Sequence, residues 1–212
     1  MELLHRATGP VATNVWVLGD PATREAIAID TATPSVAWLT EALAARGWAL
    51  RLVVSTHRHW DHIGDNAAVV AATGAELAVH ALDRHGLESP DPLFAPFPIV
   101  PSVPARELAE RDEIRFGAIR LEVLHTPGHT EGSVCLLAPE ERLLFSGDTL
   151  FAGGWGRVDL AGGSPDAMVA SLDRLATLDA DLAVLPGHGP RTTIARELPW
   201  MQLVAAERRL IR

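Results

Sequence analysis

Short apolar runs alternate with longer amphipathic stretches along most of the chain. Apolar runs bounded by glycine, proline or aspartate are typical of buried strands, and apolar positions that repeat every 3.6 residues or so are typical of helices. Strands are therefore expected at residues 15–19, 25–30, 50–55, 76–80, 113–116, 120–124, 133–138, 142–146 and 182–185. Helices are expected from an N-cap at Thr33 or Ser35 to Arg46, and at residues 66–73, 164–178 and 194–209. The alternation predicts an α/β fold in which two packed sheets carry helices on their outer faces.

A proline-rich segment at residues 89–104 interrupts this pattern. Its prolines stand at positions 90, 92, 96, 98, 101 and 104. Because proline fixes φ and lacks an amide hydrogen, the segment cannot be a helix or a central strand. We expect an ordered surface loop, which is either a simple connector or a cover over a pocket.

The length of 212 residues fits one domain, and we expect a single domain over residues 1–212. No uninterrupted apolar run approaches the roughly 20 residues that cross a bilayer, so no membrane partner is expected. The first ten residues contain no apolar stretch of the kind found in secretory signals, which makes the cytoplasm the expected compartment.

The charged residues exclude several kinds of chemistry. All 18 basic residues are arginine, and tyrosine is absent, so the chain has no Schiff-base lysine, no P-loop lysine and no phenolic acid. The net charge of −9 argues against nucleic acid as a partner and favours a small-molecule substrate. The single cysteine, Cys135, lies in an apolar run, where we expect a buried free thiol.

The strongest chemical signal is the cluster His57-x-His59-x-Asp61-His62, directly after the expected strand 50–55. Histidines two positions apart on an extended segment point to the same side, so both imidazoles can reach one metal ion. Asp61 and His62 lie where the chain turns into a helix, and their side chains can reach a second, neighbouring ion. Zinc, manganese and iron accept this mixture of imidazole and carboxylate ligands.

Three further candidate ligands follow other expected strands. They are His129, Asp148 and His188. Each lies in a glycine-flanked loop at a strand end, where backbone freedom allows a side chain to be aimed at a common site. Asp30, at the end of another strand, is a candidate acceptor for the outer nitrogen of a ligand imidazole.

The remaining histidines fit no ligand position. They are His5, His80, His85 and His125. Among them, His125 is expected to support the turn before His129, and no partner can be identified for His80. Arg58 and Trp60, inside the histidine motif, are interpreted as spacers.

The order of these motifs resembles the metallo-β-lactamase superfamily, and more narrowly its glyoxalase II-like hydrolases. The resemblance rests on the histidine motif, the Thr-Pro-Gly-His-Thr turn at 126–130, Gly-Asp-Thr-Leu-Phe at 147–151 and Gly-His-Gly at 187–189. It covers essentially the whole chain from residue 30 to residue 189 and implies a four-layer αββα sandwich with a binuclear metal site at one edge of the sheets. It leaves one helix after the last motif, so no separate substrate domain is expected.

Residue by residue, the resemblance implies two divalent metal ions, with zinc as the first expectation and iron or manganese as alternatives. One ion would be held by His57, His59 and His129, the other by Asp61, His62 and His188, and Asp148 would bridge them. The implied activity is hydrolysis of a thioester by a metal-bridging hydroxide, with Asp61 orienting the hydroxide or passing a proton to the leaving group.

The segment Gly-Gly-Trp-Gly-Arg at 153–157 resembles the stretch by which glyoxalase II relatives hold the carboxylate of glutathione. Arg157 is therefore the candidate substrate-binding residue, since a guanidinium matches carboxylate geometry. The lack of tyrosine and of an extra helical domain departs from glyoxalase II and leaves the acyl group and the thiol open.

Other reactions of the superfamily stay open. A persulfide dioxygenase would use a single iron held by His57, His129 and Asp148. Hydrolysis of another ester, a lactone or a phosphodiester is a further alternative, and a non-catalytic binding module is the last. The oligomeric state cannot be inferred from the sequence.

Overall fold

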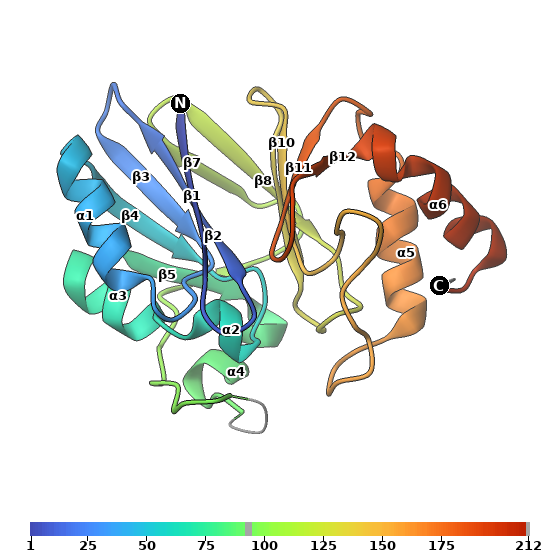
Figure 1. Cartoon of the computed structure of the whole chain (residues 1–212), viewed down its shortest axis with the longest axis horizontal. Helices are drawn as coiled ribbons and strands as arrows, with labels where there is room; N and C mark the ends of the chain where they lie inside the picture. Colours follow the sequence, from blue (N-terminus) through green and yellow to red (C-terminus); the bar gives the residue numbers. More distant parts are fainter. Residues whose placement is uncertain (92–94, 211–212) are drawn as a thin grey trace.

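The computed structural model describes residues 1–91 and 95–210, which form two sheets packed face to face (Figure 1). The first sheet contains, in spatial order, β1 (Glu2–Thr8), β2 (Thr13–Asp20), β3 (Glu25–Ile29), β4 (Ala49–Val54), β5 (Glu76–His80) and β6 (Arg106–Leu108). The second contains β12 (Thr192–Thr193), β11 (Ala183–Pro186), β10 (Leu143–Gly147), β9 (Val134–Ala138), β8 (Ile119–His125) and β7 (Glu113–Phe116).

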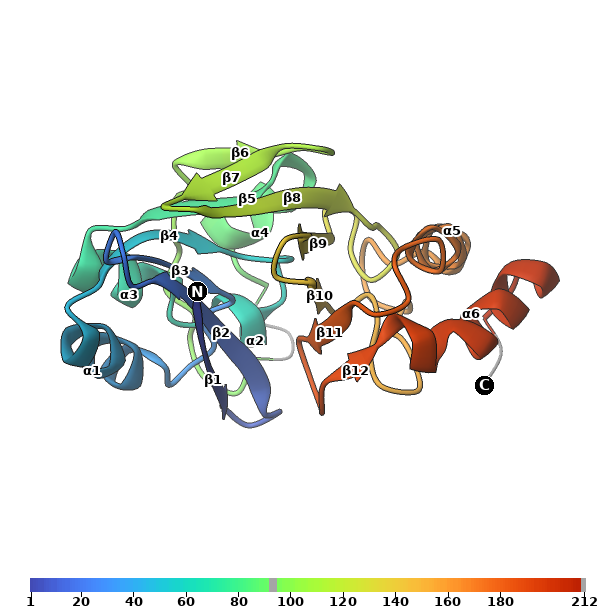
Figure 2. The ribbon, with the colours of Figure 1, turned by 90° about the horizontal axis from the view of Figure 1, so that it is seen from above.

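Helices cover the outer face of each sheet. Figure 2 shows α1 (Val36–Arg46) and α3 (Asn66–Thr73) beside the first sheet, and α5 (Pro165–Leu175) and α6 (Ile194–Glu207) beside the second. Two short helices, α2 (Trp60–Ile63) and α4 (Arg84–Glu88), lie at one end of the first sheet, the latter after a 3₁₀ turn at Ala81–Asp83. None of the helices in the described residues is both long and apolar enough to span a membrane.

Three apolar clusters hold these layers together. The central cluster contains side chains from both sheets, including Trp16, Ile27 and Phe145. A second cluster joins the first sheet to α1 and α3, and a third joins the second sheet to α5 and α6. Because each sheet has apolar side chains on both faces, burial between helices and a partner sheet removes them from water. The predicted four-layer αββα sandwich is confirmed.

The strand directions bring several loops to one edge of the sandwich. In the first sheet β3, β4 and β5 are parallel, and in the second β10 and β11 are parallel. The carboxyl ends of parallel strands meet at the same edge of a sheet, where loops are free to carry functional side chains. The loops after β4, β8, β10 and β11 carry the predicted metal ligands.

Every predicted strand and helix is present, but five strands and α-helices of the described residues were missed. They are β1, β6, β12, α2 and α4. Two predicted helices end earlier than expected. The hydroxyl of Thr177 donates to the carbonyl of Arg174 at the end of α5, and Arg208 takes a left-handed conformation (φ 51°) at the end of α6. Both features satisfy terminal carbonyl groups or turn the backbone, which ends a helix.

The start of α1 also differs from the prediction. Ser35 stands at the N-cap, but its side chain makes no capping hydrogen bond. The carboxylate of Asp65 accepts hydrogen bonds from the backbone amides of Ser35 and Val36 instead. A carboxylate from a distant segment thus satisfies the free amides that a local cap usually takes.

The proline-rich segment has neither helix nor strand over residues 89–91 and 95–104, as predicted, whereas residues 92–94, with Pro92, lie outside the described residues. Phe97 packs edge-on against Trp60 of the histidine motif, with ring centroids 5.8 Å apart. The segment therefore contacts the loop that carries the predicted metal ligands, and Trp60 is more than a spacer.

Candidate metal centre

The loops at the carboxyl ends of four strands bring all seven predicted ligands together. Three mutually close groups result: a first group of His57, His59 and His129, a second group of Asp61, His62 and His188, and a central group of His57, His62 and Asp148. Within each group the potential ligand atoms lie within 4.8 Å of one another. The groups share residues, so they form one continuous cluster.

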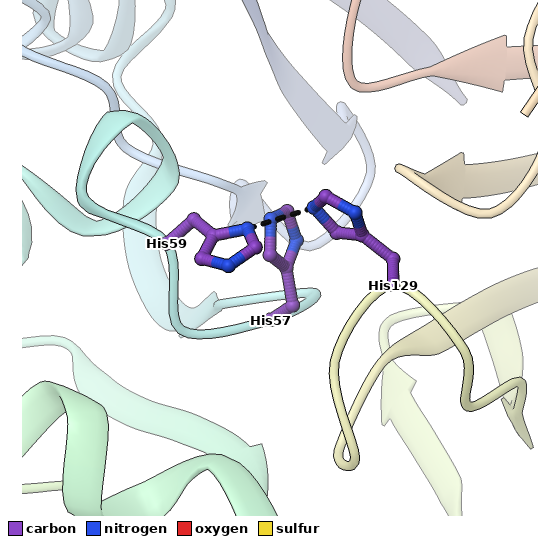
Figure 3. Close-up of side chains that lie close together, drawn as sticks. All are labelled: His57, His59 and His129. Atoms are coloured by element: carbon purple, nitrogen blue, oxygen red, sulfur yellow. Dashed lines mark hydrogen bonds between the residues drawn. The ribbon is translucent and has the colours of Figure 1, made fainter. Parts of the chain in front are cut away.

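The first group joins the loops after β4 and β8. Figure 3 shows the rings of His57, His59 and His129 turned toward one another from these two loops. Nδ1 of His59 and Nε2 of His129 are 2.7 Å apart. Nε2 of His57 is buried and has no hydrogen-bond partner among the described residues. Three imidazole nitrogens therefore converge on one small volume.

The second group joins α2 to the loop after β11. Oδ2 of Asp61 lies 3.1 Å from Nε2 of His188 and 3.4 Å from Nε2 of His62. The two imidazole nitrogens lie 3.2 Å from each other. One carboxylate oxygen and two nitrogens thus face a common point, a donor set that divalent transition metals accept.

Asp148 lies between the two groups. Its Oδ1 is 3.4 Å from Nε2 of His62, and its Oδ2 is 3.5 Å from Nε2 of both His129 and His188. The carboxylate approaches the cluster closely because Gly187 has no side chain, since a Cβ there would meet Oδ1 at 2.2 Å. One carboxylate consequently faces histidines of both groups.

The outer nitrogen of each buried histidine is held by an acceptor. Nδ1 of His62 donates to Oδ2 of Asp30 at 2.8 Å, so the predicted acceptor role of Asp30 is confirmed. The same carboxylate accepts the Thr56 hydroxyl at 2.9 Å, and Oγ1 of Thr56 lies 3.1 Å from Nδ1 of His57. These contacts leave Nε2 of both histidines directed into the cluster, as in metal sites where outer partners fix the imidazole tautomer.

Backbone carbonyl groups hold two other histidines in the same way. Nδ1 of His129 lies 2.6 Å from the carbonyl oxygen of Arg157, and Nδ1 of His188 lies 3.1 Å from that of Val11. His59 is the exception, because its Nδ1 faces the cluster. The orientation of the other four rings is therefore fixed from outside the cluster.

Burial and neighbouring charges lower the pKa values of two clustered histidines. Burial, together with adjacent histidines, lowers the pKa of His57 well below its usual value and lowers the pKa of His59 to about 3. Both imidazoles are neutral at pH 7, which is the form that binds metal.

The carboxylates of the cluster stay charged. Burial alone would raise the pKa values of Asp61 and Asp148. The attraction of His62 and His188 for both carboxylates is larger than this effect and holds both pKa values below the usual range. Burial likewise opposes protonation of His62 and His188, yet the surrounding carboxylates raise the pKa of each. The second group is thus a place where negative charge attracts a cation.

Two buried ligand atoms that lack partners in the described part of the chain are a second sign that the residues fit divalent metal ions. Nε2 of His57 and Oδ1 of Asp148 are buried ligand atoms without a hydrogen-bond partner among the described residues. A buried polar atom left unpaired is costly, and such atoms concentrate at functional sites. Here both atoms belong to a cluster of imidazoles and carboxylates, which is the donor set of zinc, iron and manganese.

The other histidines lie outside the three groups, as expected. His5 pairs with Asn14, and the ring nitrogen of His125 contacts the carbonyl oxygen of Glu131, which supports the turn around His129. The missing partner of His80 is His125, whose ring stacks on it with centroids 4.1 Å apart.

Arg58 was interpreted as a spacer, and this was wrong. Its guanidinium forms an ion pair with Asp83, a fully buried carboxylate in the 3₁₀ turn. The sequence held one signal for this pair: Asp83 follows an expected strand at the same edge of the sheet as the other site residues.

Arg157 lies on the loop after β10, at the border of two cavities. A cavity of about 390 Å³ opens over the cluster between Trp60, Phe151 and Leu160, and a cleft of about 1010 Å³ lies between Trp155 and Trp200. Both are lined by Arg157, whose exposed guanidinium makes two contacts with Asp159, at 2.7 and 2.8 Å. The predicted carboxylate-binding group is thus at the mouth of the site, paired with a carboxylate of the chain itself.

Cys135 is buried, as expected, and burial raises the pKa of its thiol to about 11. A thiol that stays protonated is a weak nucleophile, so Cys135 has no place in the chemistry of the site.

The chain is similar over most of its length to proteins named hydroxyacylglutathione hydrolase. It is 38% identical over 177 residues to a hydroxyacylglutathione hydrolase of Methylococcus capsulatus, which covers 82% of this chain and 61% of that protein. The chain thus spans less than two thirds of the length of this relative.

Solved structures share the fold, among them the three that follow. A B3 metallo-beta-lactamase, BLEG-1, has a TM-score of 0.87 and 32% identity, covering 93% of this chain and 97% of that one. TTHA1623 in a di-iron-bound form has a TM-score of 0.81 and 34% identity, covering 92% and 96%. ETHE1 from Myxococcus xanthus has a TM-score of 0.80 and 30% identity, covering 97% and 85%.

Residues 8–188 match the metallo-beta-lactamase superfamily, a range that contains all seven clustered side chains. The chain therefore belongs to the metallo-beta-lactamase superfamily.

Proposed function

We propose that this protein is a thioester hydrolase that depends on two divalent metal ions. The observation that carries the proposal is the cluster of five imidazoles and two carboxylates, in which Asp148 faces both the first and the second group. Similarity to a hydroxyacylglutathione hydrolase supports thioesters as the substrate class.

In this proposal the first group would hold one ion and the second group the other, and Asp148 would be available to both. Two such ions, when bound, supply an acidified water and a Lewis acid for the carbonyl oxygen of the substrate. Zinc is the first candidate, and iron is a strong alternative because a similar protein was solved in a di-iron-bound form.

The chain's own groups orient the reaction. Asp30 and two backbone carbonyl groups keep three of the imidazoles in the tautomer that would present Nε2 to an ion. Asp61, which also accepts the hydroxyl of Thr13 at 3.1 Å, is ionised at neutral pH. It is therefore suited to accept a hydrogen bond from the attacking water and so to orient it.

Substrate binding is assigned to Arg157 and the cavity over the cluster. An exposed guanidinium at the mouth of a pocket binds a carboxylate in a two-point contact. We propose a small-molecule thioester carrying a carboxylate, rather than nucleic acid, because the net charge of −9 disfavours a polyanion.

The test combines elemental analysis, thioester hydrolysis and oxygen consumption. We expect about two metal ions per chain, release of free thiol from S-lactoylglutathione or a smaller thioester, and no oxygen uptake. His188→Ala should remove one ion and most of the activity, because it removes a ligand of the second group. His85→Ala, at a histidine outside the three groups, is the matched control and should change neither quantity.

A persulfide dioxygenase is the second candidate, because His57, His129 and Asp148 would suffice for a single iron, and Oδ2 of Asp148 lies 3.5 Å from Nε2 of His129. Such an enzyme should tolerate His188→Ala. Oxygen uptake with glutathione persulfide, about one iron per chain and no turnover of any thioester, ester, lactone or phosphodiester would overturn the hydrolase proposal.

A further inference from the structure

Arg58 and Asp83 form a buried ion pair beneath the first group. Nη1 of Arg58 lies 2.5 Å from Oδ1 of Asp83, and the Asp83 side chain is completely buried. The side chain of Arg58 is 11% exposed, although arginine side chains are seldom buried unless they are paired. Removing two charges from water is costly, so such a pair persists where hydrogen bonds satisfy both partners.

Asp83 accepts hydrogen bonds from both loops that carry the first group. From the loop after β4 it accepts the backbone amide of Arg58 at 3.0 Å, between His57 and His59. From the loop after β8 it accepts the hydroxyl of Thr130 at 2.6 Å and the amide of Gly132 at 3.0 Å. One carboxylate consequently joins the two segments whose histidines must meet.

Arg58 extends the same network to a third loop. Its Nη2 donates to the carbonyl oxygen of Ala161 at 2.7 Å. That loop also contains Arg157, whose carbonyl oxygen lies 2.6 Å from Nδ1 of His129. The guanidinium therefore connects the loop of His59 to the segment that orients His129.

Three glycines make room for the pair. A Cβ on Gly86 would lie 2.6 Å from Cβ and Cδ of Arg58, and one on Gly132 would lie 2.7 Å from Cγ of Asp83. A Cβ on Gly162 would lie 2.3 Å from Nη2 of Arg58. The backbone of three separate segments thus packs directly on the two side chains, which leaves them one arrangement.

We propose that the Arg58–Asp83 pair is the positioning device of the first group and fixes the separation of His59 and His129. The histidines of the second group have other outer partners, since His62 is held by Asp30 and His188 by the carbonyl of Val11. This inference rests on the proposed function in taking His57, His59 and His129 as metal ligands.

The test measures zinc affinity in backgrounds that isolate one group at a time. His188→Gln weakens the second group and leaves the first intact, whereas His59→Gln does the reverse. We add Asp83→Asn to each and titrate the metal-free full chain with zinc against a chelator. In the His188→Gln background Asp83→Asn should weaken zinc binding about 10- to 100-fold, as loss of an outer partner typically does. In the His59→Gln background the affinity should stay unchanged.

Two milder variants address the case in which Asp83→Asn does not fold. Arg58→Lys keeps the charge but loses the second nitrogen that reaches Ala161, and Gly86→Ala crowds the Arg58 side chain. Both should lower zinc affinity of the first group alone. Asp20→Asn is the control, because Asp20 is also a buried carboxylate that accepts amides from two turns, those of Ala22 and Ala118.

The outcomes separate this inference from the proposed function. A wild-type chain that binds no zinc would overturn both. A second result would be that the wild-type chain binds two ions, while Asp83→Asn, Arg58→Lys and Gly86→Ala change the zinc affinity of the first group no more than Asp20→Asn does. That result would overturn the positioning role alone. Equal weakening of both groups would also overturn it, because the pair would then act on general stability.

Discussion

Each of four clustered histidines uses its two ring nitrogens differently. One nitrogen is held by an oxygen acceptor outside the cluster, as His62 is by Asp30, and the other faces inward. The inward Nε2 of His57 has no hydrogen-bond partner among the described residues and is costly to bury, so the arrangement favours a bound cation. The sequence could show which residues were candidates, because the motif spacing is local. It could not show that the backbone carbonyl groups of Arg157 and Val11 are outer acceptors, because every residue has a carbonyl group whatever its side chain.

Arg157 and Asp159 give a prediction about substrate selection. Arg157→Ala should raise the KM for carboxylate-bearing thioesters and largely spare kcat, because binding is lost equally in the ground and transition states. Asp159→Asn should lower the KM for the same substrates, since it removes the carboxylate that pairs with the guanidinium.

Steady-state kinetics with matched thioesters, one with and one without the carboxylate, check this prediction. The uncharged thioester is the control and should respond to neither variant. An unchanged KM for the charged thioester in both variants would remove Arg157 from the substrate site.

Glu197 shows how one element holds the loop beside the site. The carboxylate is 1% exposed on α6, and it accepts the backbone amide of Gly153 at 2.7 Å and the indole nitrogen of Trp200 at 2.6 Å, together with the hydroxyl of Thr192. The last helix is thereby tied to the start of the loop that contains Arg157. The apolar periodicity of residues 194–209 predicted this helix but gave no reason for a buried acid within it.

Replacing Glu197 by glutamine should lower the free energy of unfolding by about 1–3 kcal/mol, because the new amide group places a donor among three donors. Urea unfolding measures this change. Glu207→Gln, at an exposed position of the same helix, should stay within about 0.5 kcal/mol of the wild type. Equal effects of the two changes would show that the buried contacts of Glu197 contribute nothing.

Elements of different length differed in how well the sequence predicted them. Long or strongly apolar ones, such as β4 and α1, were recovered within one or two residues. β6 has three residues, β12 two and α2 four, which is too short for a periodic pattern to register. β1 was missed because His5 and Arg6, both exposed, fall within it, so no continuous apolar run marks the strand.

The whole molecule should lose stability as the metal-free protein is acidified. The pKa values of His57 and His59 are lowered in the folded state from a usual value of 6.5, that of His59 to about 3. Between the folded-state and unfolded-state pKa values of these histidines, the unfolded chain binds more protons than the folded chain. The free energy of unfolding therefore falls as pH falls, by up to about 1.4 kcal/mol per pH unit for each histidine. His62 and His188, whose pKa values are raised in the folded state, change the free energy of unfolding only above pH 6.5. Below that pH both imidazoles are protonated in the folded and in the unfolded chain.

Urea unfolding of the metal-free protein at a series of pH values between 7 and 4 checks this sign. His59→Gln should flatten the slope, since it removes one of the groups responsible for it. A free energy of unfolding that rises on acidification would contradict the assignment of neutral histidines in the folded cluster.

At this largest scale the fold was predictable and its close contacts were not. The αββα layering follows from strands such as β2, in which every residue is buried, and from helices with one apolar face. The joining of segments by Asp65 or Asp83 depends on the meeting of distant residues, and no local pattern carries that information.

The link between β2 and the loop after β11 sets an order of assembly. Thr13 pairs with His188 across the backbone, and the side chain of Asn14 donates to the carbonyl oxygen of Pro186, 172 positions away. Contacts so distant along the chain close late, because the loop between them must first be ordered. On a ribosome, His57, His59 and His129 can meet as soon as the first half of the second sheet has emerged, whereas His188 is still unmade. The first group can therefore be complete before the second group during each round of synthesis.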